Sequence, residues 1–113
     1  MSRLAEQSVT PAKKDSQALT QKHIDAYLDQ LTDWTVVDSG EAPLLERTYQ
    51  FEDFMAALDF VNQVGEAAEE VNHHPEITFT WGKATVRWWT HVIVGLHIND
   101  FIMAARTDEI YHS

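Results

Sequence analysis

The chain has 113 residues, of which 44% are hydrophobic, and this is enough for one domain with one core. Its 18 acidic residues against eight Lys and Arg give a formal charge of -10, which disfavours binding to the phosphates of nucleic acids. The absence of cysteine excludes disulfides, thiolate catalysis and cysteine-type zinc sites. No apolar run approaches the roughly 20 residues that span a bilayer, and the N-terminus lacks a secretory signal, so we expect a cytoplasmic protein without a membrane partner.

Residues 1–19 mix small, polar and charged types around Pro11 without a sustained period, which predicts a flexible N-terminal tail. The folded domain is then expected to span residues 20–113. Thr20 is typical of a helix N-cap, and Asp33 ends the element that it begins. The apolar stripe of this predicted helix is formed by Ile24, Tyr27, Leu28 and Leu31.

Two short strands are predicted next, over residues 34–37 and 45–51, with a turn around Gly40 and Pro43 between them. Side chains alternate between the two faces of a strand. One face of the second strand therefore carries Leu45, Arg47, Tyr49 and Phe51. The two strands are expected to pair as a hairpin.

A helix of about five turns is predicted between Asp53, which can cap its start, and Asn72. Pro75 cannot continue a helix, and the residue before a proline avoids helical angles. The helix is therefore expected to end just before His73 and His74. Its buried side is predicted from helical spacing to consist of Phe54, Leu58, Val61, Val64, Ala68 and Val71.

Residues 77–81 and 84–89 alternate about a Gly82-Lys83 turn and predict a second hairpin. A last helix is predicted to be capped by Asn99, with Asp100 in its first turn, where the helix dipole favours an acid. This order of elements indicates an α+β domain: a four-stranded antiparallel sheet with helices packed on one face, in a two-layer sandwich. Such a sheet leaves its other face and its edges open, so we expect a homodimer or a tetramer.

Three of the six histidines fall where the predicted fold can bring them together. His73 and His74 follow the long helix, and His91 ends the strand that returns from it. Glu69 lies one helical turn before His73, and Asp100 opens the last helix. Histidine exchanges a proton near neutral pH, so a pocket that holds several imidazoles suits general acid–base chemistry.

The run Glu69-x3-His73-His74-Pro75-x5-Trp81-x9-His91-x8-Asp100 resembles the signature of the pterin-4a-carbinolamine dehydratases, and every fixed position of that pattern is met. The likeness covers roughly residues 20–111. It includes an aromatic stretch that leads into the long helix, formed by Tyr49, Phe51, Phe54, Leu58 and Phe60. A match of this length implies the family's fold more strongly than its activity.

The resemblance implies dehydration of a 4a-hydroxytetrahydropterin to the quinonoid dihydropterin by histidine general acid–base catalysis, without a cofactor. It implies that His74 and His91 are the acid–base pair, and that His73 is a second acid–base group or a binding group. Which imidazole acts as acid and which as base stays open. The substrate-binding residues that it implies are Glu69, Pro75, Trp89, Thr90 and Asp100.

Two positions differ from the best-known animal members of that family. Ile77 replaces a tryptophan, and Trp89 replaces a small polar residue two positions before His91. The indole of Trp89 could stack on a pterin or fill the space that a pterin needs. The sequence Trp89-Thr90-His91 resembles a bacterial and plastid branch, some of whose members are associated with assembly of ribulose-bisphosphate carboxylase (RuBisCO). The resemblance therefore leaves a second role open: a catalytically weak or inactive assembly chaperone, associated with the carboxysome, whose partner is the RuBisCO large subunit.

Simpler interpretations stand beside these. Imidazoles at a helix C-terminus interact favourably with its free carbonyl groups, which alone could account for His73 and His74. Asp100 could be only a first-turn acid, and Glu69 only a solvated one. Zinc is a further alternative, but neighbouring histidines diverge and rarely ligate one ion, so no metal is predicted. The core is expected to include Trp34, Trp81 and Trp88.

Overall fold

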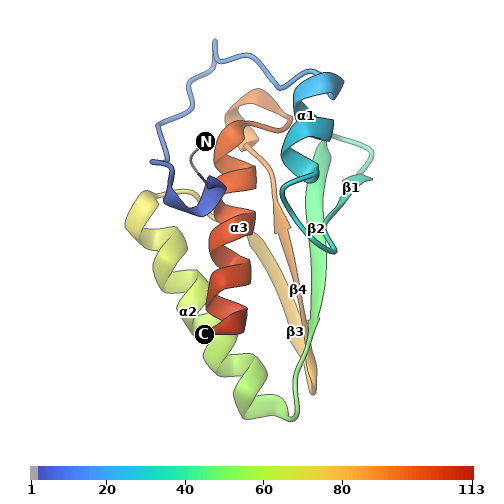
Figure 1. Ribbon diagram of the computed structural model, residues 1–113, viewed down its shortest axis with the longest axis vertical. Helices are drawn as coiled ribbons and strands as arrows, with labels where there is room; N and C mark the ends of the chain where they lie inside the picture. The colour runs from blue at the N-terminus through green and yellow to red at the C-terminus, as the bar shows by residue number, and fades with distance from the viewer. Residues whose placement is uncertain (1–2) are drawn as a thin grey trace.

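A computed structural model describes residues 3–113. The helices are α1 (Gln21–Leu28), α2 (Phe54–Val71) and α3 (Ile98–His112), the strands are β1 (Thr35–Asp38), β2 (Pro43–Gln50), β3 (Glu76–Thr80) and β4 (Lys83–Trp88), and two short 3-10 helices are η1 (Leu4–Glu6) and η2 (His91–Ile93). The strands form one antiparallel sheet in the order β1-β2-β4-β3, and α2 and α3 cover the same face (Figure 1). The predicted α+β fold class is confirmed. No helix among the described residues combines the length and the hydropathy needed to cross a membrane.

Both predicted hairpins are present, and a third pairing joins them. Val36 pairs with Leu45 in the first hairpin, and Ile77 pairs with Val86 in the second. Strand β4 also pairs with β2, where Val86 lies opposite Arg47, so β4 lies inside the sheet. The end of β4 therefore lies beside the segment that enters β3, and this segment is the one that carries His73 and His74.

The ends of α2 follow from local chemistry. The Asp53 carboxylate accepts a hydrogen bond from the Ala56 backbone N–H at 2.8 Å, as the sequence predicts for an N-cap. Asn72 ends the helix in the left-handed conformation (φ 53°, ψ 42°), which asparagine tolerates better than most residues. Because Asn72 reverses the chain direction, the two residues after it leave the helix axis towards α3.

The start of α3 differs from the prediction. Its N-cap is His97 rather than Asn99. The His97 ring nitrogen Nδ1 accepts from the Asn99 N–H at 3.1 Å, and the Asp100 carboxylate accepts from the His97 N–H at 2.9 Å. This reciprocal cap draws the side chain of Asp100 back over the helix end. Asp100 therefore lies in the first turn, as predicted, but its carboxylate points into the protein.

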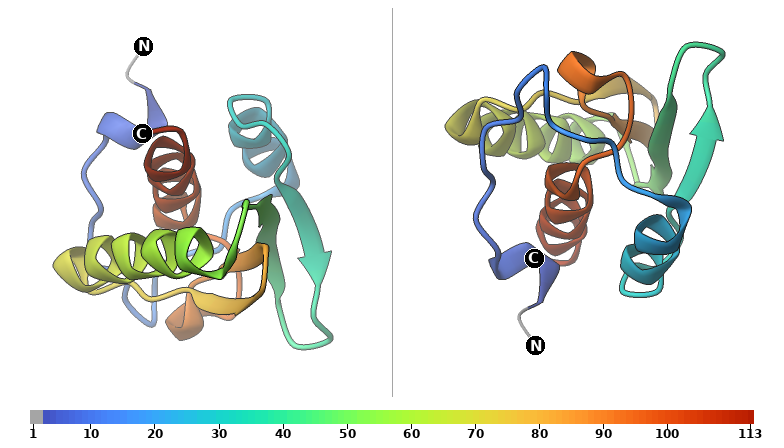
Figure 2. Two further views of the ribbon diagram at one scale, coloured as in Figure 1. Left: turned by 90° about the horizontal axis from the view of Figure 1, so that it is seen from below. Right: turned by 90° about the horizontal axis from the view of Figure 1, so that it is seen from above.

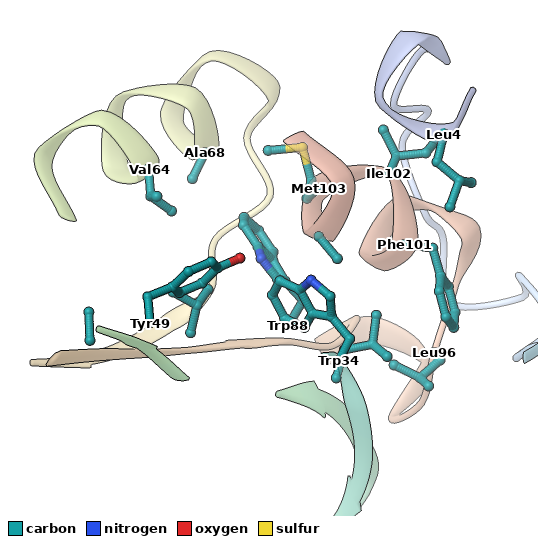
Figure 3. Close-up of a cluster of buried hydrophobic side chains, with 14 of the residues drawn as sticks. Leu4, Trp34, Tyr49, Val64, Ala68, Trp88, Leu96, Phe101, Ile102 and Met103 are labelled. Atoms are coloured by element: carbon teal, nitrogen blue, oxygen red, sulfur yellow. The ribbon is translucent and has the colours of Figure 1, made fainter. Parts of the chain in front are cut away.

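The core fills the space between the sheet and the helices (Figure 3). Trp34 and Trp88 belong to it, with 6% and 0% of their surface exposed, as predicted. Trp81 does not, because it lies in the turn between β3 and β4 and is 68% exposed. On α2 the predicted burial is confirmed for Val64 and Ala68, each 1% exposed. It is wrong for Phe54, which is 42% exposed at the first helical position, and the other fully buried residues are Ala57 and Phe60.

The N-terminal segment runs beside α3 and then across its N-terminal end to α1 (Figures 1 and 2). Leu4 is 3% exposed and belongs to the core. Arg106 of α3 donates hydrogen bonds to the carbonyl oxygens of Ala5 and Gln7 at 3.1 and 2.6 Å. The structure thus gives the predicted tail specific contacts with the domain. How freely residues 1–19 move, and the domain boundary at residue 20, stay predictions.

Candidate functional site

A cavity of about 400 Å³ opens where α2, η2, the start of α3 and the N-terminal segment meet. Its lining includes His73, His74, Thr90 and His91. The remaining walls come from residues 9–12, Val71, Asn72, Val92 and Asn99. Three imidazoles that the sequence places at two distant points of the chain therefore share one cavity.

His73 is the most firmly held of the three imidazoles. Its Nε2 lies 2.7 Å from Oδ1 of Asp100, and 13% of its side chain is exposed. The ring of Trp88 stacks on the imidazole, with centroids 5.5 Å apart and an interplanar angle of 25°. A carboxylate accepts hydrogen bonds, so Nε2 carries the proton of this contact and Nδ1 is the remaining nitrogen of the ring.

Asp100 connects three parts of the fold at this point. It is fully buried. Besides its contact with His73, its carboxylate accepts from the hydroxyl of Thr90 at 2.8 Å and from the N–H of His97 at 2.9 Å. Three donors satisfy a buried carboxylate that would otherwise be costly to remove from water. Asp100 thereby fixes the exit of α2, the end of β4 and the start of α3 relative to one another.

His74 has a second carboxylate, in a more open setting. Its Nε2 lies 2.7 Å from Oε2 of Glu69, one turn back on α2. The two side chains are 53% and 78% exposed. Such a solvated pair contributes little to stability. The contact can nevertheless orient the imidazole, because it turns Nε2 towards Glu69 and leaves Nδ1 on the other side of the ring.

His91 is held by the backbone rather than by a carboxylate. It opens η2, which leads into a short loop closed by a hydrogen bond from the Thr90 N–H to the Gly95 carbonyl at 2.9 Å. Val94 in this loop adopts a left-handed conformation (φ 49°), which is strained for a β-branched residue. The loop is therefore tight, and it holds His91 at the mouth of the cavity.

Trp89 lies next to His91, but it does not line the cavity. The two rings are 4.4 Å apart between centroids. The indole instead borders a second hollow of about 300 Å³, whose lining includes Arg87 and His91. Consequently Trp89 does not fill the space between the three histidines.

Of the residues predicted for the site, four line the cavity: His73, His74, Thr90 and His91. Glu69 does not line the cavity but bonds His74, and Asp100 does not line it but bonds both His73 and Thr90. Trp89 reaches the cavity through its contact with the ring of His91. Pro75 follows His74 in the chain and is not part of the lining.

Sequence reasoning missed the wall that residues 9–12 provide, together with Asn99. The composition of residues 1–19 predicts a tail, and no periodic pattern in it signals contact with the cavity. Asparagine often caps helices, and for this reason the sequence predicts Asn99 as the cap of the last helix. Its side chain is instead 2% exposed and pairs with the backbone of Thr10.

This arrangement suits proton transfer to and from a small ligand. Imidazole is the side chain most often used as a general acid or base, and two of the three imidazoles are oriented by carboxylates. Within residues 3–113, no group of three or more His, Asp or Glu side chains is gathered closely enough to hold a metal ion.

A protein-family model described as pterin 4 alpha carbinolamine dehydratase matches residues 17–110. A protein of Microcystis aeruginosa is 47% identical over 111 residues, covering 98% of this chain and 96% of its own. A protein of Marinobacter nauticus is 46% identical over 111 residues, covering 98% of this chain and all of its own. Both carry the name "Putative pterin-4-alpha-carbinolamine dehydratase".

Two solved structures share the fold. A transcriptional coactivator/pterin dehydratase from Brucella melitensis superposes with a TM-score of 0.77 at 31% identity, covering 83% of this chain and 98% of its own. A pterin dehydratase-like protein described as a RuBisCO assembly factor in the alpha-carboxysome gives a TM-score of 0.62 at 20% identity, covering 73% of this chain and 93% of its own. The second likeness concerns the fold alone.

Proposed function

Because the chain belongs to the pterin 4 alpha carbinolamine dehydratase family, we propose that it dehydrates a 4a-hydroxytetrahydropterin to the quinonoid dihydropterin. The observation that carries this proposal is the single cavity lined by His73, His74 and His91. A volume of about 400 Å³ falls in the range of small-molecule sites.

The reaction needs one proton donor and one proton acceptor. The bond between C4a and the hydroxyl oxygen breaks, the hydroxyl takes a proton and leaves as water, and N5 loses its proton as the C4a–N5 double bond forms. The overall change is loss of one water molecule, with no oxidation or reduction. We assign His74 and His91 as the acid–base pair.

His73 is the binding group in this proposal, with a second acid–base role open to it. Its Nε2 proton is engaged by Asp100, so it is held in one orientation whether or not a ligand is present. Thr90 lines the cavity while its hydroxyl donates to the same carboxylate. Asp100 and Glu69 then act by orienting histidines, and Trp89 acts by packing against His91. Pro75 acts by ending α2 ahead of the two histidines.

The test is dehydration of a 4a-hydroxytetrahydropterin by the purified protein. His74→Ala and His91→Ala should each lower kcat by about a hundredfold, since each removes a general acid or base. His112→Ala is the matched control, because this exposed histidine ends α3 away from the cavity and should leave kcat unchanged. The proposal fails if the wild-type protein does not accelerate the reaction over buffer.

A second candidate function follows from the fold likeness to the RuBisCO assembly factor. In this alternative the chain is a weak or inactive dehydratase that assists assembly of the RuBisCO large subunit in the carboxysome. Its formal charge of -10 suits a protein-binding surface. Co-expression with a large subunit should then raise the yield of assembled RuBisCO, and an unchanged yield counts against this role.

We also propose that the protein self-associates as a homodimer or a tetramer. The helices cover one face of the sheet, and β3 forms an edge whose backbone groups have no neighbouring strand on one side. A second copy could cover both features. Sedimentation equilibrium measures the mass directly, and a monomer at micromolar concentration would contradict this expectation.

A further inference from the structure

Residues 9–12 line the cavity together with the three histidines, although Ala12 and His73, the nearest members of the two groups in sequence, are 61 positions apart. The lining places this segment beside the end of α2, at Val71 and Asn72, and the start of α3, at Asn99. The right view of Figure 2 shows the N-terminal segment as it passes these helix ends. Its side chains are Val9, Thr10, Pro11 and Ala12, none of which titrates. The segment can therefore contact a ligand but cannot move a proton.

The side chain of Asn99 holds this segment in place. Its Oδ1 accepts from the Thr10 N–H at 3.1 Å, and its Nδ2 donates to the Thr10 carbonyl at 2.5 Å. The amide thus pairs with both backbone groups of one residue, as a neighbouring strand would. Asn99 is 2% exposed, and exposure this low is unusual for an asparagine. Its polar atoms are satisfied only because the segment is there.

Within the segment Val9 also packs against the core, and the other anchors lie further along the chain in both directions. Arg106 binds the carbonyl oxygens of Ala5 and Gln7, and Leu4 packs beside Ile102 in the core (Figure 3). On the far side, the Leu19 N–H donates to the Leu96 carbonyl at 2.9 Å. Within residues 3–113, the two bonds from Asn99 are the only hydrogen bonds that join residues 8–18 to the remainder of the protein. Every hydrogen bond that places the wall at the cavity is therefore made by Asn99, and the packing of Val9 on the core adds to them.

We propose that residues 9–12 form a wall of the pterin-binding site, and that Asn99 is a positioning residue that sets its place. This inference rests on the proposed function. Asn99 and Asp100 are adjacent at the start of α3, so one helix end sets both the wall and the orientation of His73. The wall adds apolar contact to the ring of the bound pterin. It therefore strengthens binding of substrate and transition state alike and leaves the chemical step to the histidines.

The inference predicts a change in KM without a change in kcat. Asn99→Ala removes both bonds, and Thr10→Pro removes the Thr10 N–H donor at an exposed position where the following Pro11 already favours extended angles. Each variant should raise KM for the 4a-hydroxytetrahydropterin roughly tenfold, with kcat within about twofold of wild type. Both should weaken binding of 7,8-dihydropterin, measured by calorimetry, by a similar factor.

Ser8→Pro is the matched control. Ser8 does not line the cavity, and its N–H makes no hydrogen bond within the described chain. The residue before it, Gln7, has φ −78° and ψ 152°, which a following proline accepts. This variant should keep the wild-type KM and the wild-type affinity for 7,8-dihydropterin.

The outcomes separate this inference from the proposed function. Active wild-type protein with an unchanged KM in Asn99→Ala and Thr10→Pro overturns the wall while the dehydratase stands. A kcat that falls in these variants at constant KM also overturns it, because the segment would then support the catalytic groups. Wild-type protein that neither reacts with nor binds a pterin overturns both proposals.

Discussion

Two carboxylates on α3, Asp100 and Asp108, each collect three side-chain or backbone donors from the surrounding fold. Asp100 accepts from His73, Thr90 and the backbone of His97. Asp108 accepts from the indole of Trp34 at 3.0 Å, from Arg47 at 2.8 Å and from the hydroxyl of Tyr49 at 2.5 Å. Both clusters fasten the same helix to the sheet, one near each end.

The two clusters differ in the proton chemistry of their donors. Trp34 and Arg47 contribute an indole and a guanidinium, which are side chains that act only as hydrogen-bond donors. Burial, together with the hydrogen bond and the negative charge of Asp108, raises the pKa of Tyr49 above its ordinary value, so this hydroxyl also keeps its proton. Only the Asp100 cluster includes a histidine, and that histidine lines a cavity with two others. In both places a carboxylate with three donors therefore holds parts of the fold together. Only at Asp100 is one of the donors a histidine, His73, which makes this cluster the candidate for proton transfer.

The largest effect is expected from Asp108→Ala. It removes the acceptor of the Trp34 indole and the Tyr49 hydroxyl, and it leaves the mostly buried guanidinium of Arg47 with only its contacts to the Thr32 carbonyl and Asp33. The free energy of unfolding should fall by about 3 kcal/mol. Urea denaturation measures the change. Glu109→Ala is the control, because its exposed pair with Arg3 should contribute less than about 1 kcal/mol. Equal losses in the two variants would show that the Asp108 cluster is not a structural anchor.

Asp100→Asn tests whether the Asp100 cluster supports catalysis through His73. The amide keeps the size of the carboxylate, and its oxygen can still accept from Thr90 and His97. Its NH2 then faces Nε2 of His73, which must accept instead of donate, so the variant reverses the tautomer of His73. We expect kcat for pterin dehydration to fall roughly tenfold or more. Asp108→Asn should leave kcat within about twofold while it lowers stability. If both variants change kcat equally, the distinction between the clusters is wrong.

The fall in the free energy of unfolding at alkaline pH should depend on the Tyr49 hydroxyl. Its pKa is higher in the folded protein than in the unfolded chain, so its contribution is fully present below about pH 10 and is lost as the pH rises further. The loss should approach roughly 1 kcal/mol for each pH unit. Urea unfolding at a series of pH values between 8 and 11 measures this slope. Tyr49→Phe should flatten it, and a slope equal to that of wild type would contradict the assignment.

The smallest effect is expected in the loop that carries His91. Val94 is β-branched, left-handed and 58% exposed, so Val94→Gly relieves backbone strain and gives up little buried surface. We expect the free energy of unfolding to rise by less than about 1 kcal/mol. Asn72→Gly, at the left-handed residue before His73, should change the free energy of unfolding by only a few tenths of a kcal/mol, because asparagine already tolerates this conformation. A loss of stability in Val94→Gly would show that the side chain of Val94 matters more than its angles.

Signals between residues close in the chain were enough to predict the helices and strands and the approximate place of the histidines. Pro75 ends α2, Asp53 begins it, and alternation marks the strands, because these signals act between residues close in the chain. Since a hairpin brings its two ends together, the approach of His91 to His73 also followed from local order.

Which surfaces of these elements pack together depends on contacts between distant parts of the chain. Helical spacing marks several apolar residues of α2, but only packing against the sheet chose the line that contains Ala57 and Phe60 over Phe54. The pairing of Thr10 with Asn99 joins residues 89 positions apart, and that of Trp34 with Asp108 joins residues 74 positions apart. Such contacts leave no periodic trace in the sequence, because their geometry exists only after the helices lie on the sheet.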